Sequence, residues 1–190
     1  MNQKTLGIAS AAIVAAIVVV AIVWHFAAPK GRVETSAQAP PIAKVVVGSH
    51  APEFVLPTTG GVFDMNAAQK PAFVEVFATW CPHCQRETAV IDRLYDAYKS
   101  RASFVGVSGS DQAMDESSPA SQADVLAWTQ RFHAIYPVAY DPNLTVANSY
   151  LQGGFPSFAI VGRDGNVTYL NSGEVSYTDL AAALDSALRR

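Results

Sequence analysis

Hydrophobic residues along the chain follow two repeating patterns, and after residue 48 these patterns predict strands that alternate with helices. Continuous apolar runs at residues 72–78 and 104–107 are typical of strands buried on both faces of a sheet. Apolar residues at helical spacing predict helices over residues 84–99, 121–132 and 177–188. This order predicts an α/β domain with a central mixed sheet and helices on both of its faces.

Shorter segments complete the predicted domain. Turn residues at Pro57, Gly60 and Gly61 indicate an N-terminal hairpin, and Asp164-Gly165 indicates a second, tight one. The remaining elements are hairpin strands at 54–56 and 62–63, an exposed polar loop at 108–120, a strand at 137–140, a short helix at 143–151, and paired strands at 157–161 and 167–170.

One segment near the N-terminus is too apolar for a soluble domain. Residues 6–28 contain no Asp, Glu, Lys or Arg. As a helix this segment would reach roughly 34 Å, which is enough to cross a hydrocarbon core of about 30 Å. We therefore expect a transmembrane anchor within residues 1–28, followed by a linker at residues 29–47 and one domain at residues 48–190.

A cleaved signal peptide is the alternative to an anchor. Residues 37–39 have the Ala-x-Ala form of a cleavage site, but Pro40 follows them, and the apolar stretch exceeds the usual ~7–15 residues. Basic residues lie on both sides of the stretch, at Lys4 and at Lys30 and Arg32, so the positive-inside rule does not decide the orientation. The length of the stretch favours the uncleaved anchor.

Composition and charge narrow the range of functions. Half of the 190 residues (50%) are hydrophobic and only 15% are charged, which excludes an intrinsically disordered chain. The formal net charge of -3 leaves no basic excess to bind phosphates. We therefore expect no nucleic-acid partner.

The two cysteines of the chain, Cys81 and Cys84, are separated by Pro82 and His83. Such a pair can exchange disulfides, form half of a metal site or pack in a core. A zinc site needs about four ligands, and the chain has no second pair of this kind. The position of the two thiols after an apolar strand and at the start of a helix favours redox chemistry over inert packing.

The helix start explains how the pair would react. Unpaired backbone N–H groups and the positive end of the helix dipole stabilise a thiolate at Cys81, which makes Cys81 the nucleophile. Cys84 lies one turn further along and can attack the resulting mixed disulfide, forming a Cys81–Cys84 disulfide. Pro82 restricts the turn, and His83 is expected to tune the Cys81 thiolate. Trp80 is either packed in the core or forms a lid beside Cys81.

The segment from Phe77 to Glu87, Phe-Ala-Thr-Trp-Cys-Pro-His-Cys-Gln-Arg-Glu, resembles the active site of thioredoxin-fold proteins. The closest subgroup is that of the membrane-anchored TlpA/ResA-like thiol-disulfide oxidoreductases, although the Pro-His dipeptide resembles the DsbA type. Supporting features are the entry segment 48–54, an acid at position 75 and the segment 154–158. The resemblance implies a thioredoxin-like fold with an N-terminal hairpin and one strand-helix insertion.

The resemblance also implies roles for three further residues. Glu75, the one charge in its apolar strand, would be buried with a raised pKa and would exchange a proton with Cys84. Pro156 would follow a cis peptide bond. The backbone of Phe155 would then pair with an extended substrate strand.

The function implied is disulfide exchange with protein thiols and disulfides, without a metal or other cofactor. The reductive version resembles cytochrome c maturation and needs a membrane donor such as a DsbD/CcdA-like protein. The predicted anchor and the lack of surplus cysteines indicate a single-pass protein of the cytoplasmic membrane, with its domain facing the periplasm or cell exterior.

Three alternatives remain open. The Pro82-His83 dipeptide favours an oxidase that donates disulfides to folding proteins and is recharged by a DsbB-like protein. The entry segment 51–54 is compatible with a thiol peroxidase, but Ala78 stands where such enzymes carry Thr. A tethered binding module without catalysis is the non-enzymatic alternative.

Overall fold

The computed structural model describes residues 44–66 and 69–190. The predicted transmembrane helix and residues 29–43 of the predicted linker lie outside these residues. Residues 44–47, also predicted as linker, instead pack on the domain, because Val45 is buried in its core and its backbone N–H donates to the Ser149 carbonyl oxygen at 3.0 Å. Within the part of the chain that is described, no helix is both long enough and apolar enough to cross a membrane.

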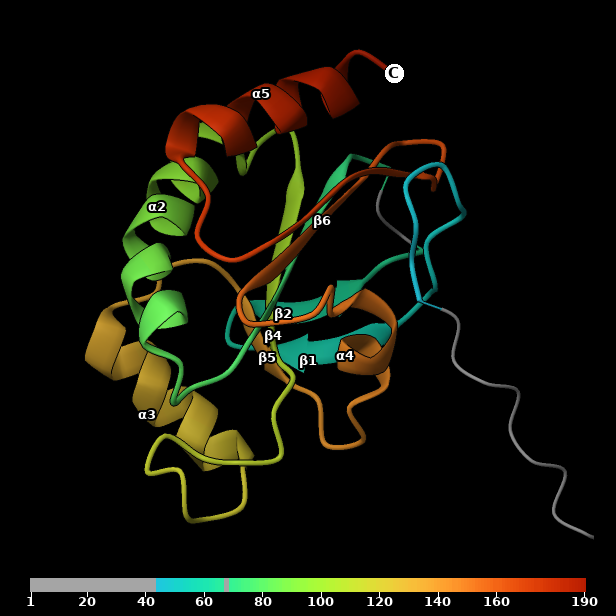
Figure 1. The fold of residues 1–190 in the computed structure, drawn as a ribbon. Coiled ribbons are helices and arrows are strands. Elements are labelled where there is room, and N and C mark those ends of the chain that lie inside the picture. Colours follow the sequence, from blue (N-terminus) through green and yellow to red (C-terminus); the bar gives the residue numbers. More distant parts are fainter. Residues whose placement is uncertain (1–43, 67–68) are drawn as a thin grey trace, which may run out of the picture. The chain divides into compact units, whose positions relative to one another are not determined.

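Seven strands form one mixed sheet, shown in Figure 1, in the order β2-β1-β5-β4-β3-β6-β7. At its centre β3 runs parallel to β4 and antiparallel to β6, which confirms the predicted mixed sheet. The strands are β1 (Val55–Thr58), β2 (Gly61–Asp64), β3 (Ala72–Phe77), β4 (Ser103–Ser108), β5 (Val138–Tyr140), β6 (Ser157–Val161) and β7 (Val167–Ser172). The central strands carry the apolar runs because both of their faces are covered.

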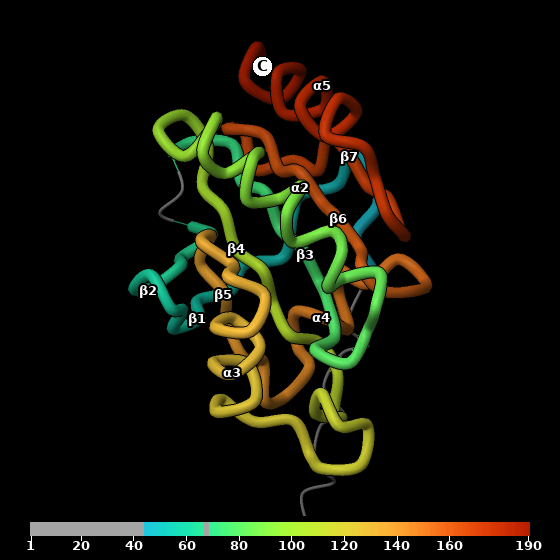
Figure 2. Tube along the Cα trace, turned by 90° about the vertical axis from the view of Figure 1, so that its left-hand side faces the viewer, coloured from blue at the N-terminus to red at the C-terminus, as the bar shows by residue number. Residues whose placement is uncertain are grey.

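Four helices in the described part of the chain cover the two faces of the sheet. They are α2 (Pro82–Tyr98), α3 (Gln122–Phe132), α4 (Thr145–Tyr150) and α5 (Tyr177–Leu188). Apolar residues of α2, α3 and α5 pack with Phe73 and Phe77 of β3, whereas α4 packs with Val74 and Val76. Figure 2 looks onto the side of α2, α3 and α5. Alternate residues of β3 therefore enter two separate cores, as the two-residue period of a strand requires.

Local sequence determines where the helices begin. Ser121 and Ser176 accept hydrogen bonds from the backbone N–H groups of Asp124 and Asp179, respectively, and so cap α3 and α5. Helix α2 begins at Pro82, two residues before the predicted start, because proline suits a first helical position. Pro57 was expected in a turn but lies in β1, opposite Val62.

The core under α2 predicts the effect of a truncation. Leu94 is fully buried, so Leu94→Ala is expected to lower the free energy of unfolding by about 2–5 kcal/mol through lost burial and a cavity. Leu126→Ala on α3 is the matched control, because 42% of that side chain is exposed. Urea unfolding of the reduced protein measures both, and equal losses would contradict this packing.

Candidate active site

The two cysteines lie where the central strand meets helix α2. Cys81 occupies the N-cap position of α2, and its Sγ accepts a hydrogen bond from the backbone N–H of Cys84 at 3.4 Å. The Cys81 thiol in turn donates to the carbonyl oxygen of Phe155 at 3.6 Å. Both cysteines are free thiols. The predicted placement of the pair at a helix start is confirmed.

The two thiols differ in exposure. Cys81 is 4% exposed, whereas Cys84 is fully buried. Burial, the negative charge of Glu75 and the hydrogen bond with Cys81 raise the pKa of the Cys84 thiol far above its usual range. Cys81 is therefore the more exposed of the two sulfurs, and Cys84 is a neutral thiol that would need a base before it could attack.

Glu75 is the buried acid whose charge acts on Cys84. It lies in the middle of β3, fully buried, and burial raises its pKa from 4.5 to about 8 despite an opposing hydrogen bond. That bond is donated by the Tyr136 hydroxyl to Oε2 of Glu75 at 2.9 Å. The predicted burial and raised pKa are confirmed, and the alternative of a carboxylate on the protein surface is excluded.

Pro156 follows Phe155 through a cis peptide bond, as predicted. The segment is held against the end of β7, because the backbone N–H of Gly173 donates to the Pro156 carbonyl oxygen at 2.8 Å. The Ser157 hydroxyl also donates to the carbonyl oxygen of Gly154 at 2.7 Å. Residues distant in sequence thus fix the Phe155 carbonyl next to Cys81.

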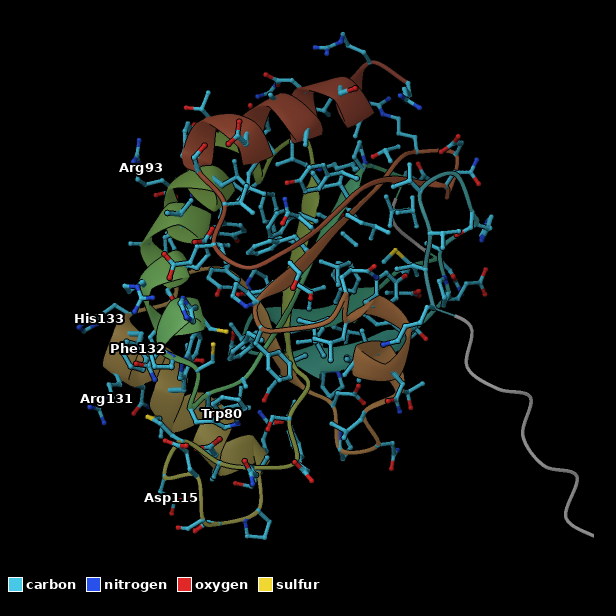
Figure 3. All side chains as sticks on the ribbon, viewed as in Figure 1. Trp80, Arg93, Asp115, Arg131, Phe132 and His133 are labelled. Atoms are coloured by element: carbon cyan, nitrogen blue, oxygen red, sulfur yellow. The ribbon has the colours of Figure 1, made fainter. Side chains whose placement is uncertain are left out.

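Trp80, labelled in Figure 3, was expected either in the core or beside Cys81, and it lies at the edge of the core. The side chain is half-buried and packs against the core under α2 and α3. Its indole Nε1 donates to the Ser110 hydroxyl at 2.8 Å, and its ring meets Phe155 edge-on, with the ring centroids 5.8 Å apart. Trp80 and Phe155 therefore form an aromatic rim on the two chain segments that flank Cys81.

His83 points to a different partner from the one predicted. Its side chain is 61% exposed, and Nδ1 lies 2.6 Å from Oε1 of Glu174. Arg86 also binds this carboxylate, through its Nε at 3.0 Å. Arg86 and His83 together lower the pKa of Glu174. The role of His83 in tuning Cys81 stays a prediction.

Sequence reasoning missed three of the residues that support the site: Tyr136, Ser110 and Glu174. Each contacts a predicted residue from 30 or more positions away, so spacing along the chain carries no trace of the contact. A weak signal for Tyr136 was available, because Gly106 interrupts an otherwise apolar buried strand and marks a place of close approach. Among the described residues, no cluster of His, Cys, Asp or Glu is suited to hold a metal ion.

Comparisons with known proteins agree with this geometry. Residues 46–186 match the Redoxin family. Thiol-disulfide oxidoreductase ResA of Geobacillus kaustophilus is 28% identical over 146 residues, covering 75% of this chain and 78% of the relative. Thioredoxin-like protein YneN of Bacillus subtilis is 24% identical, with 73% and 78% covered.

Solved structures show the same fold. The crystal structure of a thiol:disulfide interchange protein described as DsbE, from Chlorobium tepidum, has a TM-score of 0.65 at 22% identity, covering 76% of this chain and 99% of that one. The structure of DsbF from Mycobacterium tuberculosis, in mixed oxidized and reduced forms, has a TM-score of 0.55 at 25% identity, covering 70% and 94%.

The buried acid predicts how stability depends on pH. Glu75 keeps its proton up to a pKa of about 8 in the folded chain, but only up to its ordinary value of 4.5 when exposed. Between these values the unfolded state binds fewer protons, so the free energy of unfolding falls as pH rises, by about 1 kcal/mol per pH unit from this group. Glu75→Gln is expected to remove that part of the slope.

Urea unfolding of the reduced protein from about pH 5 to about pH 8 measures this slope. Glu53→Gln is the control, because Glu53 is an exposed glutamate and its substitution leaves the buried acid in place. Glu87 is also buried, with a pKa near 7, and adds a slope that all the proteins share. An unchanged slope in Glu75→Gln would show that Glu75 is ionised in the folded protein.

Proposed function

The chain belongs to the Redoxin family and is a TlpA/ResA-like member of the thioredoxin superfamily, and from this premise we propose that it is a thiol-disulfide oxidoreductase that reduces disulfides in other proteins. One observation carries the proposal. A reachable cysteine caps a helix, and a second, buried cysteine donates its backbone N–H to the first sulfur while a buried acid lies at its side.

The first step is attack on the substrate disulfide. The Cys81 thiolate bonds to one substrate sulfur, and the other leaves as a thiolate that takes a proton from water. The Cys84 N–H at 3.4 Å and the start of α2 stabilise the negative charge on Cys81 before the attack. Trp80 and Phe155 bound the approach to this sulfur.

The second step releases the substrate. Cys84 gives its proton to the Glu75 carboxylate and attacks Cys81, which forms the Cys81–Cys84 disulfide and expels the reduced substrate thiolate. Burial raises the pKa of both groups, so the transfer uses the ionised fraction of Glu75 and passes its negative charge to Cys84. A DsbD/CcdA-like membrane protein is proposed to return the electrons, and cytochrome c maturation is the process proposed.

The location follows from the sequence. Residues 6–28 are long and apolar enough to act as an anchor, and residues 29–43 would tether the domain beside the membrane. We place the catalytic domain in the periplasm or at the cell exterior, where proteins form disulfides.

One observation favours a second candidate function, oxidation of folding proteins with a DsbB-like partner. The chain has Pro82 and His83 between its cysteines, the dipeptide that resembles DsbA-type oxidants. In this version the Cys81–Cys84 disulfide is donated to the substrate, and the same two steps run in reverse.

Trapping of substrates tests disulfide exchange itself. Cys84→Ser removes the resolving thiol, so substrate proteins are expected to remain bound to Cys81 as mixed disulfides that dissociate on reduction. Mass spectrometry of the adducts from membranes identifies the partners, and Cys81→Ser is the control that should trap none. Equal recovery from both variants would refute Cys81 as the nucleophile and support a binding module.

The reduction potential separates the two directions. The reductase proposal predicts a potential more negative than about −220 mV, whereas a DsbA-like oxidase lies near about −120 mV. Equilibration with glutathione, read as the fraction of Cys81–Cys84 disulfide, measures it. His83→Gln is expected to change the potential little, because the exposed His83 ring is turned to Glu174; a large negative shift would favour the oxidase.

A further inference from the structure

Tyr136 reaches the buried acid of the site from a different strand. It lies just before β5, on the face of the sheet that α2 and α3 cover, and is 1% exposed. The register pairs Gly106 of β4 with Glu75 on one side and with Val138 on the other. The Tyr136 ring therefore crosses one whole strand to bring its hydroxyl within 2.9 Å of Glu75 Oε2.

A glycine makes this crossing possible. A Cβ at position 106 would lie 2.8 Å from Cε2 of the Tyr136 ring and 3.1 Å from Glu75 Oε2. Any larger residue at this position would push the ring or the carboxyl group away. The missing side chain of Gly106 thus leaves space in β4 where the Tyr136 hydroxyl and the Glu75 carboxyl group meet.

The two carboxyl oxygens of Glu75 have different surroundings. Oε2 accepts the Tyr136 hydrogen bond, whereas Oε1 is buried without a hydrogen-bond partner among the described residues. When the acid is neutral, its proton is therefore carried on Oε1, because Oε2 already acts as the acceptor. Oε1 is left as the oxygen that can take a proton from a neighbour or return one.

We propose that Tyr136 is a positioning residue that holds Glu75 with its Oε1 free for proton exchange with Cys84. The inference rests on the proposed function and adds a residue to it. Tyr136 touches neither the substrate nor the sulfurs in this scheme, and it acts only through the carboxyl group that it orients.

The proton transfer balances within the second step of the reaction. The Cys84 Sγ–H proton moves to Oε1 of the Glu75 carboxylate, Cys84 Sγ bonds to Cys81 Sγ, and the bond between Cys81 and the substrate sulfur breaks. The substrate sulfur leaves with the electron pair and takes a proton from water. When the Cys81–Cys84 disulfide is reduced again, Oε1 returns its proton to Cys84.

The charges around Glu75 make the Tyr136 hydroxyl decisive for this exchange. From α2, Glu87 and Asp92 disfavour the carboxylate form of Glu75, and the Glu75 charge in turn raises the pKa of Cys84 on that helix. The Tyr136 hydroxyl, from the segment before β5, is the group that favours the carboxylate. Without it, a smaller fraction of Glu75 would be ionised at neutral pH and able to accept the Cys84 proton.

The test is the substitution Tyr136→Phe, which keeps the ring and removes the hydroxyl. The reduced full chain is mixed with oxidised glutathione, quenched with acid, and analysed by mass spectrometry for the Cys81–glutathione adduct over time. The adduct is expected to persist about tenfold longer at pH 7, and the pH midpoint of its resolution to rise by about one pH unit. The rate of adduct formation at Cys81 should not change.

Tyr150→Phe is the matched control. Tyr150 is equally buried, and its hydroxyl donates to the Pro52 carbonyl oxygen at 2.7 Å, but it packs in the core under α4 on the opposite face. Its loss should leave the pH midpoint unchanged. A midpoint in Tyr136→Phe equal to that of the wild type, or the same shift in both variants, would overturn the inference.

The wild-type chain and the Glu75→Gln variant together separate a failure of the proposed function from a failure of the positioning role of Tyr136. If the wild-type chain forms no adduct and no Cys81–Cys84 disulfide, the proposed function fails and the role of Tyr136 fails with it. If Glu75→Gln abolishes the pH dependence of resolution while Tyr136→Phe leaves it intact, the proposed function stands and only the positioning role is refuted.

Discussion

The centre of the sheet holds one carboxyl group from which water is excluded, and the protonation of the buried groups near it depends on this burial. Glu75 sits in the middle of the central strand, between phenylalanines that pack against the helices, and keeps its proton to about pH 8 because its charge would be poorly solvated there. The same dry surroundings keep the Cys84 thiol neutral. The arrangement costs stability at neutral pH, since the unfolded chain can ionise the acid freely. The sheet must therefore be well packed to hold it.

The position of the acid and the position of the nucleophile have one structural origin. Strand β3 delivers Glu75 into the core and ends at Phe77, and a short connection then leads to Cys81, the N-cap of α2. The first turn of α2 then places Cys84 above the strand, fully buried on the same face as Glu75. Because the strand and the helix are both rigid, the positions of Glu75 and Cys84 relative to each other are fixed.

Much of this could be predicted from the sequence, because it depends on local patterns. The apolar runs and helical repeats indicated the sheet and its helices, and a lone glutamate in an apolar run indicated a buried acid. The contact of Tyr136 with Glu75 spans 61 positions, and that of His83 with Glu174 spans 91. Such contacts depend on the strand order β5-β4-β3 and on the loop after β7, which are set by the packing of the whole sheet. Hydrophobic periodicity contains no information about them.

The surroundings of His83 bear on the direction of electron flow. A protonated histidine between two cysteines makes a pair more oxidising only if its positive charge acts on the nucleophilic sulfur. Here the ring is turned to Glu174, whose carboxylate lies 2.6 Å away and opposes that charge at close range. Most of the His83 side chain is also exposed, where water screens what remains. This geometry therefore gives the Pro-His dipeptide less influence on Cys81 than its place in the sequence suggests.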